Sequence, residues 1–260
     1  MKRSTFGSWA SVAIGAIYFL LPLLATFEFS LRMKRGVYSF EAYRIVLGDV
    51  HFQASFLYSV VLALATIIVG AIIVTPTAYW VRLKLPKLRP VVEFVTLLPL
   101  VVPAIVIVFG HLRMYNSQSL LPLTDSNFGT DVLITFGYVT LSLPYMYRSV
   151  DTALGAIDVA TLTEAAESLG ASRFQTLTRV IFPNIRAGLL SGAFLTFAIV
   201  IGEFTFASLL NRPAFGPYLQ LVGANRAYEP AALAIIAFVV TWAALGLMQL
   251  VGAARRAVTK

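Results

Sequence analysis

Cysteine is absent from this sequence and charged residues are scarce. None of the 260 residues is cysteine, and only 12% are charged, whereas a soluble domain carries about 25%. The first absence excludes disulfides and thiolate metal sites. The two histidines, His51 and His111, lie far apart without ligand-like neighbours, so no metal site is expected. With 58% hydrophobic residues, the composition indicates a membrane protein.

Motifs for catalysis are also missing from the sequence. There is no glycine-rich loop followed by Lys and Ser or Thr, so ATP is not expected to bind here through a P-loop. No nucleophile elbow, paired carboxylates or HExxH pattern occurs, and no catalysis is expected on this chain. The net charge of +8 comes from cations that flank hydrophobic runs rather than from one long basic run. It therefore does not indicate nucleic-acid binding.

Long apolar runs dominate the chain, each near the ~20 residues that cross a bilayer as a helix. They predict an all-α polytopic membrane protein with six transmembrane helices. No internal repeat or long linker is visible, so residues 1–260 are expected to form a single transmembrane domain. The expected spans cover residues 9–29, 56–81, 91–112, 131–147, 187–210 and 231–252.

Basic residues predict the orientation of these spans. The turn RLKLPKLR, residues 82–89, carries four cations and no acid, which is typical of a cytoplasmic loop. With six spans, both termini and the central loop at about residues 151–187 face the cytoplasm. The first outer loop, residues 32–55, fits least well, because it also carries several cations. Within it, the segment SFEAYRIV is expected to form a short helix.

A polar, amphipathic segment from Thr161 to Pro183 lies between the apolar runs. Thr161 with Glu164, and Ser172 with Gln175, have the spacing of capping boxes that begin two short helices. Gly170 is expected to end the first helix in the left-handed conformation, and Pro183 to close the second.

The segment contains a spaced pattern of residues: Glu164, Ala165, Ala166, Gly170, Val180, Phe182 and Pro183, with Ala171 after the glycine. This pattern resembles the EAA loop of the membrane-spanning subunits of bacterial ABC importers. Val180 and Phe182 replace the usual Ile and Leu. The resemblance implies the type I importer permease fold and a location in the bacterial inner membrane.

The same resemblance implies partners and cofactors. An ABC ATPase dimer on the cytoplasmic face would carry ATP and Mg, with none on this chain. A second permease, homologous but not identical, and a periplasmic or lipid-anchored substrate-binding protein would complete the importer, surrounded by membrane lipid. Glu164 would pair with a cation of the ATPase, or would only complete its own capping box. Ala165 and Ala166 would permit close approach of the two subunits.

Two acids lie in or near apolar runs. Glu93 is four residues from Arg89, so an ion pair along one helix is expected. Glu203 lies deep in the fifth expected span, where an ionisable group faces a protein interior or a wet cavity. It would line the substrate pathway with Phe204 and Phe206, or serve as a buried partner of another subunit. Both phenylalanines also suit plain packing.

The segment GEFTFASLL, with Pro213 and Pro217 beyond it, is similar to permeases for polyamines, opines and phosphonates. This similarity implies a small organic cation of the spermidine or putrescine type, or a zwitterion, as substrate. An anion such as a phosphonate, or ferric ion, is the alternative. A secondary transporter or channel working alone is the competing class of protein, but it would favour inverted repeats and more intramembrane charges.

Overall fold

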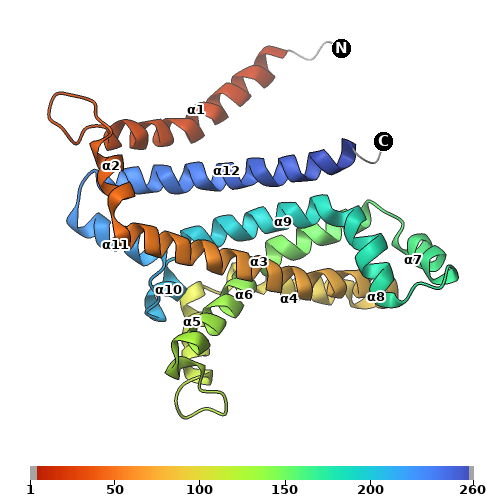
Figure 1. Ribbon diagram of the computed structural model, residues 1–260. Coiled ribbons are helices and arrows are strands. Elements are labelled where there is room, and N and C mark those ends of the chain that lie inside the picture. Colours follow the sequence, from red (N-terminus) through yellow and green to blue (C-terminus); the bar gives the residue numbers. More distant parts are fainter. Residues whose placement is uncertain (1–4, 258–260) are drawn as a thin grey trace. The chain divides into compact units, whose positions relative to one another are not determined.

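The computed structural model describes the backbone of residues 5–257 and the side chains of residues 7–247. Its long elements are all helices, as predicted (Figure 1). The chain forms two compact units, Met1–Ala54 with Tyr218–Val240, and Ser55–Pro217 with Thr241–Lys260. Lys2, Arg3 and Lys260, which support the prediction of cytoplasmic termini, lie outside the described residues.

The first unit begins with the apolar helix α1 (Thr5–Ser30). Helix α2 (Glu41–Gly48) forms where a short helix was predicted, and the beginning of α12 (Glu229–Ala257) belongs to the same unit. The stretch between the last two predicted spans, residues 211–230, is not only a loop, because it contains the helix α11 (Phe215–Asn225). Pro217 does not prevent this helix, since it sits in the first turn, where its missing N–H is not needed.

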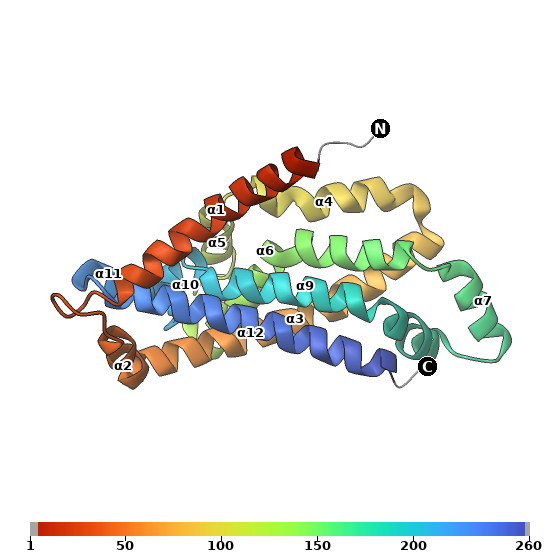
Figure 2. The same cartoon turned by 90° about the horizontal axis from the view of Figure 1, so that it is seen from above.

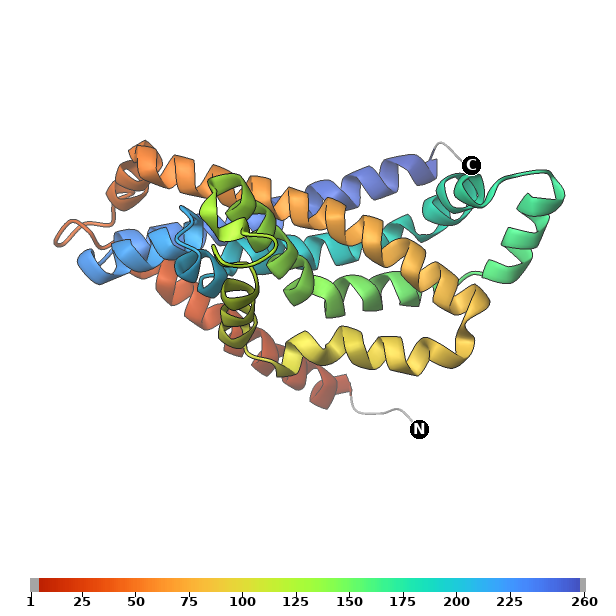
Figure 3. The same ribbon diagram turned by 90° about the horizontal axis from the view of Figure 1, so that it is seen from below.

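The second unit is built around α3 (Val50–Lys84), α6 (Asn127–Gly155) and α9 (Phe182–Gly202). Figures 2 and 3 show α6 lying beside α9 over most of their lengths. Glycine permits this close contact. A Cβ atom added at Gly188 of α9 would lie only 2.4 Å from the Cβ atom of Ala153 and 2.5 Å from the carbonyl oxygen of Ser149. Small residues of this kind let membrane helices approach backbone to backbone.

The third predicted span is not one helix. A 3₁₀ turn (Pro86–Leu88) leads into α4 (Arg89–Val101), which is followed by α5 (Ala104–Met114), and the two helices are bent by 99°. Val102 between them has extended backbone angles. Pro103 explains the break, because it disfavours a helical conformation at the preceding residue and lacks an N–H donor. A second 3₁₀ turn, Leu123–Asp125, precedes α6.

The number of spans also differs from the predicted six. Within the described residues, four helices are long and apolar enough to cross a membrane, or five if the bent pair α4–α5 is one span. Helix α6 has the necessary length, with 29 residues, but is not among them. The chain is therefore an all-helical polytopic membrane protein with four or five spans by length and composition.

Candidate functional site

The segment with the Glu-Ala-Ala pattern folds as a helical hairpin, which we call the EAA hairpin (residues 158–183). Its first helix, α7 (Val159–Ser168), begins at Asp158, whose carboxylate accepts a hydrogen bond from the backbone N–H of Thr161 at 3.1 Å. The hydroxyl of Thr161 also donates to Asp158, at 2.8 Å. These hydrogen bonds lower the pKa of the Asp158 carboxyl. The predicted capping box of Thr161 and Glu164 is wrong, because an aspartate three residues earlier already caps the helix.

Gly170 ends α7 as predicted, in the left-handed conformation with φ +82°. The N–H of Ala171 donates to the carbonyl of Ala166 at 3.0 Å, and that of Gly170 donates to Glu167 at 2.9 Å. This pair of hydrogen bonds is the Schellman motif, which satisfies the last carbonyls of a helix and needs a positive φ. The turn between the two arms of the hairpin is therefore sharply defined.

The second arm starts at Ser172, and here the predicted capping box is confirmed. Gln175 N–H donates to the Ser172 hydroxyl at 3.3 Å, and Ser172 N–H donates to the Gln175 side chain at 2.8 Å. The helix α8 (Arg173–Gln175) continues through a π-helical segment (Thr176–Ile181) into α9.

Pro183 was predicted to close this arm. It lies instead near the start of α9, and the helix continues past it. The π-helical register explains why it is tolerated. The N–H of Phe182 donates to the carbonyl of Leu177, five residues back. This wider turn lets the helix continue although Pro183 has no N–H to donate. Residues 173–202 thus form one continuous helix that joins the hairpin to a membrane span.

One face of the EAA hairpin is buried against the end of α3 and α6. Val159, Thr163 and Ala166 of α7 are buried, and Val159 shares an apolar cluster with Tyr79 of α3 and Val150 of α6. The hydroxyls of Tyr79 and Thr163 lie 3.1 Å apart and are hydrogen-bonded. The hairpin is therefore held on the helix ends by packing and by a buried polar contact.

The opposite face of the hairpin is exposed. Glu164 and Ala165 point outward, whereas Ala166 packs inward, so the two alanines of the motif differ in role. At the turn, the side chains of Leu169 and Phe174 are 90% and 74% exposed. No sequence motif marks these two residues, although bulky apolar side chains flanking the glycine of a polar segment could have indicated them. Together the exposed residues form a mixed apolar and acidic surface suited to a protein partner.

An ion cluster joins the ends of three helices beside the hairpin. Asp151 of α6 accepts hydrogen bonds at 2.8 Å from Arg82 of α3 and from Arg89 of α4. Arg89 also pairs with Glu93 at 2.9 Å, as predicted. The basic turn at residues 82–89 therefore lies at the same end of this unit as the EAA hairpin. Asp151, which no sequence motif marks, is the centre of the cluster.

Glu203 was predicted to lie inside a continuous fifth span. It lies instead at a break between two helices. Helix α9 ends at Gly202, Glu203 is extended, and the short helix α10 (Thr205–Leu209) follows. The carboxylate accepts hydrogen bonds from the backbone N–H groups of Thr205, at 2.7 Å, and Phe206, at 3.0 Å. The carboxylate is half-buried and accepts hydrogen bonds from the free backbone N–H groups at the start of α10, where a negative charge is favoured.

The two phenylalanines beside Glu203 lie in different surroundings. Phe204 is 37% exposed. Phe206 is fully buried, with its ring 6.0 Å from that of Tyr138 and 5.7 Å from that of His111. A Cβ atom at Gly137 would overlap it, so Phe206 serves the packing of α10 on α5 and α6. Within the described residues, no group of three or more His, Asp or Glu side chains could hold a metal ion.

These features define an all-helical membrane subunit with an exposed hairpin at one end and a broken span elsewhere in the same unit. Residues 67–257 match the family described as the binding-protein-dependent transport system inner membrane component, and the chain belongs to this family.

The relatives that are similar to this chain are named for two different kinds of substrate. A probable molybdenum ABC transporter permease of Haloferax volcanii is 34% identical over 56% of this chain and 54% of its own length. The spermidine/putrescine transport system permease PotB of Escherichia coli is 27% identical over 67% of this chain and 66% of its own length. The chain thus spans between about half and two thirds of the lengths of these relatives.

Solved structures have the same fold. The crystal structure of a bacterial ABC transporter that imports the acidic polysaccharide alginate contains a chain with a TM-score of 0.68, 14% identity and 94% coverage of both chains. A crystal structure of an amino acid ABC transporter with histidines gives a TM-score of 0.55 at 19% identity, over 80% of this chain and 95% of that one. The fold is that of type I ABC importer permeases.

Proposed function

We propose that this chain is the permease subunit of an ATP-driven importer and that the EAA hairpin couples it to a separate ATPase. The observation that carries this proposal is the two-sided hairpin. Its inner face is anchored by Tyr79 and Thr163, and its outer face presents Glu164 with the apolar side chains of Leu169 and Phe174. Apolar side chains would enter a groove of the ATPase, and Glu164 would pair with a cation at the rim.

The continuous helix from Arg173 to Gly202 explains how movement of the ATPase would reach the membrane. A force applied at the hairpin acts on the N-terminal end of this helix. Because α9 packs closely on α6 through Gly188 and Gly192, displacement of the hairpin would move α9 and α6 together. ATP and Mg would stay on the partner, and this chain would perform no chemistry.

Coupling can be tested in membranes that contain the chain with its ATPase and partner subunits. Phe174→Asp should lower transport-linked ATP hydrolysis by about tenfold, because it removes an apolar anchor and adds a charge. Glu164→Arg should lower it less, since a rim ion pair contributes little. Asp125→Arg, in the turn before α6, is the matched control and should retain activity. Unchanged hydrolysis in both hairpin variants, at equal complex levels, would refute the coupling role.

The proposed assembly has four kinds of component. An ATPase dimer would dock on the hairpin side, and a second, homologous but non-identical permease would complete the path. A periplasmic or lipid-anchored binding protein would deliver substrate from the other side. The hairpin, the basic turn at residues 82–89 and both termini would face the cytoplasm of a bacterial cell, which requires an even number of spans: the four apolar helices alone, or six if α4–α5 and α6 also cross.

For the substrate, we propose a small organic cation of the polyamine type, or a zwitterion, that passes Glu203 and Phe204. The support is a half-buried carboxylate at a break in a span and a relative named for spermidine and putrescine. The competing substrate is an oxyanion, favoured by the relative named for molybdenum. The backbone N–H groups at the start of α10 already offset part of the charge on Glu203, which suits weak and transient contact with a cation.

Uptake assays with spermidine and with molybdate separate these two substrates. Glu203→Gln keeps one oxygen to cap α10 but removes the charge, so spermidine uptake should fall several-fold at an unchanged complex level. Glu203→Ala removes the cap as well and should also lower the amount of assembled complex. Equal spermidine uptake by both variants and the native chain would end the cation proposal. Molybdate uptake that Glu203→Gln leaves intact would establish the oxyanion instead.

A further inference from the structure

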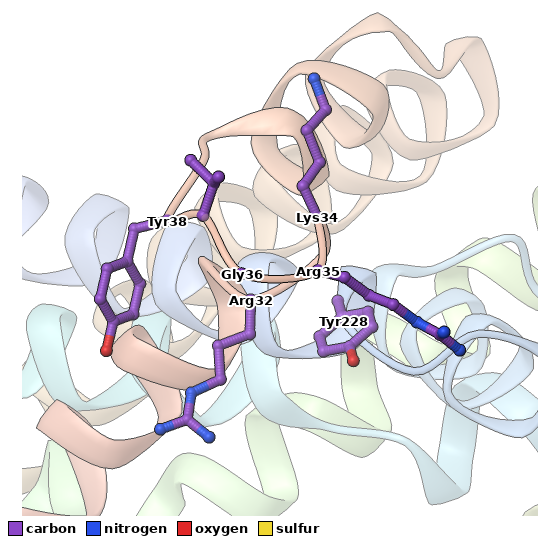
Figure 4. A pocket seen from close by; sticks show the side chains of 7 residues that line it. Arg32, Lys34, Arg35, Gly36, Tyr38 and Tyr228 are labelled. Atoms are coloured by element: carbon purple, nitrogen blue, oxygen red, sulfur yellow. The ribbon is translucent and has the colours of Figure 1, made fainter.

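The loop directly after α1 forms an open pocket of about 450 Å³ that the proposed function does not use. It lies entirely within the first unit. Its lining includes three cations, Arg32, Lys34 and Arg35, and the tyrosines Tyr38 and Tyr228. Figure 4 shows Arg32 and Tyr38 on one side and Arg35 beside Tyr228 on the other, while Lys34 points away. We call this site the basic loop pocket.

The cations of the basic loop pocket are not all neutralised. Arg32 pairs with Glu28 at 2.6 Å, and Lys34 pairs with Glu41 at 3.2 Å. No acid of the described part of the chain forms an ion pair with Arg35. Arg32 also has guanidinium donors to spare, since Glu28 cannot use all five. The pocket therefore carries a net positive charge with unused hydrogen-bond donors.

The backbone holds Arg35 at the tip of a tight turn. Gly36 has φ +77°, and the N–H of Val37 donates to the carbonyl of Lys34 at 3.3 Å. A left-handed residue at the third position of such a turn favours glycine. On the other side, the ring of Tyr228 stacks near that of Phe29, with ring centroids 5.0 Å apart. The site is thus built from a defined turn and a fixed aromatic wall.

The pocket adjoins an apolar surface that continues along α1. None of the span window within Gly7–Ser30 is buried by the rest of its unit, and its apolar composition suits contact with acyl chains. Val37, Tyr38 and Phe40 in the loop after the helix are each 65% exposed. Aromatic and apolar side chains next to cations are typical of the boundary between headgroups and acyl chains. A ligand here would meet positive charge at one end and hydrocarbon-facing surface at the other.

We propose that the basic loop pocket binds the headgroup phosphate of an anionic phospholipid whose acyl chains lie along α1. Arg35 and the unused donors of Arg32 would contact the phosphate oxygens, because the planar guanidinium matches phosphate geometry. Tyr228 would offer its hydroxyl from the wall of the pocket. A soluble acidic protein fits less well, because its charge would sit beside an unburied apolar helix that it could not cover.

The test uses the full-length chain in its complex, purified in uncharged detergent, with fluorescent phosphatidylglycerol as the probe. Arg35→Gln should weaken saturable binding about fivefold, the scale for one cation next to an anionic membrane surface. Arg35→Lys keeps the charge but loses the guanidinium geometry, so its affinity should lie between those of Arg35→Gln and the native chain, which separates loss of charge from misfolding. Arg44→Gln, on the exposed face of α2 and outside the pocket, is the matched control and should bind as the native chain does.

Competition experiments distinguish the possible ligands. Phosphatidylcholine should compete more weakly than unlabelled phosphatidylglycerol, and inorganic phosphate should not compete at equal concentration. Displacement of the probe by inorganic phosphate would identify a general anion site and overturn the lipid assignment. Displacement by poly-glutamate would favour an acidic protein partner instead. Equal binding by Arg35→Gln and the native chain would mean that the pocket is not a site. Because none of these variants touches the hairpin, the outcome is independent of ATPase coupling.

Discussion

The hydroxyl of Tyr79, at the end of α3, donates a hydrogen bond to the hydroxyl of Thr163 in α7, at 3.1 Å. The hydroxyl of Thr163 donates its own hydrogen bond to the carbonyl of Val159 at 2.7 Å, so it accepts the hydrogen bond from Tyr79. Both residues are buried at 3% exposure. This short chain of hydrogen bonds ties the EAA hairpin to a span that is distant in the sequence.

Removing the Tyr79 hydroxyl should loosen the hairpin without emptying its core. Tyr79→Phe keeps the ring but loses the hydrogen bond, at about 1 kcal/mol. Thr163→Val should have a similar cost, and the double variant should cost less than the sum of the two. Hydrogen exchange of α7 measures the loosening. Fully additive effects in this double-mutant cycle would show that the two hydroxyls do not interact.

The effect of a substitution at Gly170 should depend on the backbone preference of the new residue rather than on its size. A Cβ atom here would meet nothing within 4 Å, yet φ is +82°. Gly170→Val should cost roughly 1–3 kcal/mol of local strain and lower coupled ATP hydrolysis, whereas Gly170→Asn should be tolerated, because asparagine adopts this conformation more readily. Gly48→Val, at a site with open space and no positive φ, is the control. Equal loss in the Val and Asn variants at Gly170 would contradict the argument.

Within the ion cluster, substitution of Asp151 should lower the stability of the protein the most. Its side chain is 12% exposed, and Asp151→Asn would leave two arginines without their shared carboxylate. Breaking a buried pair on one side costs about 3 kcal/mol, so the apparent Tm should fall by roughly 6–12 °C. Arg89→Gln should cost less, since Arg89 is 42% exposed. The opposite order in thermal unfolding would show that Asp151 is not the centre of the cluster.

The first turn of α7 should become less stable in acid. The hydroxyl and the backbone N–H of Thr161 lower the pKa of the Asp158 carboxyl below its ordinary value of 3.8. A lowered pKa means that the charged cap stabilises α7 fully above pH 3.8 and that this contribution disappears as the pH falls through the lower, folded-state pKa. Hydrogen exchange at the start of α7 should follow this change. Asp158→Asn, which still caps but does not titrate, should show no such dependence.

The turn and one of the helix caps of the hairpin could be predicted from residue types alone. Gly170 and the Ser172–Gln175 box appear as predicted because each depends on neighbours within a few residues. Thr161 was assigned the wrong role for the same local reason: Asp158, three residues earlier, offers a stronger cap. Pro183 does not end the helix, because a π-helical turn precedes it, and the residue types around a proline do not show whether such a turn is present.

Apolar length and charge in the sequence were enough to determine an all-helical membrane protein and the Arg89–Glu93 pair, since these depend on composition and on spacing along one helix. The family followed from the resemblance of the Glu-Ala-Ala motif to the EAA loop. Tertiary structure alone decided the break at Glu203, the burial of Phe206, the meeting of Arg82, Arg89 and Asp151, and the contact between Tyr79 and Thr163. Each of these joins residues from different helices or depends on what neighbouring helices cover. A hydropathy pattern records that a segment is apolar, but it does not record which helix lies against it, and only that contact determines whether a side chain packs, pairs or stays exposed.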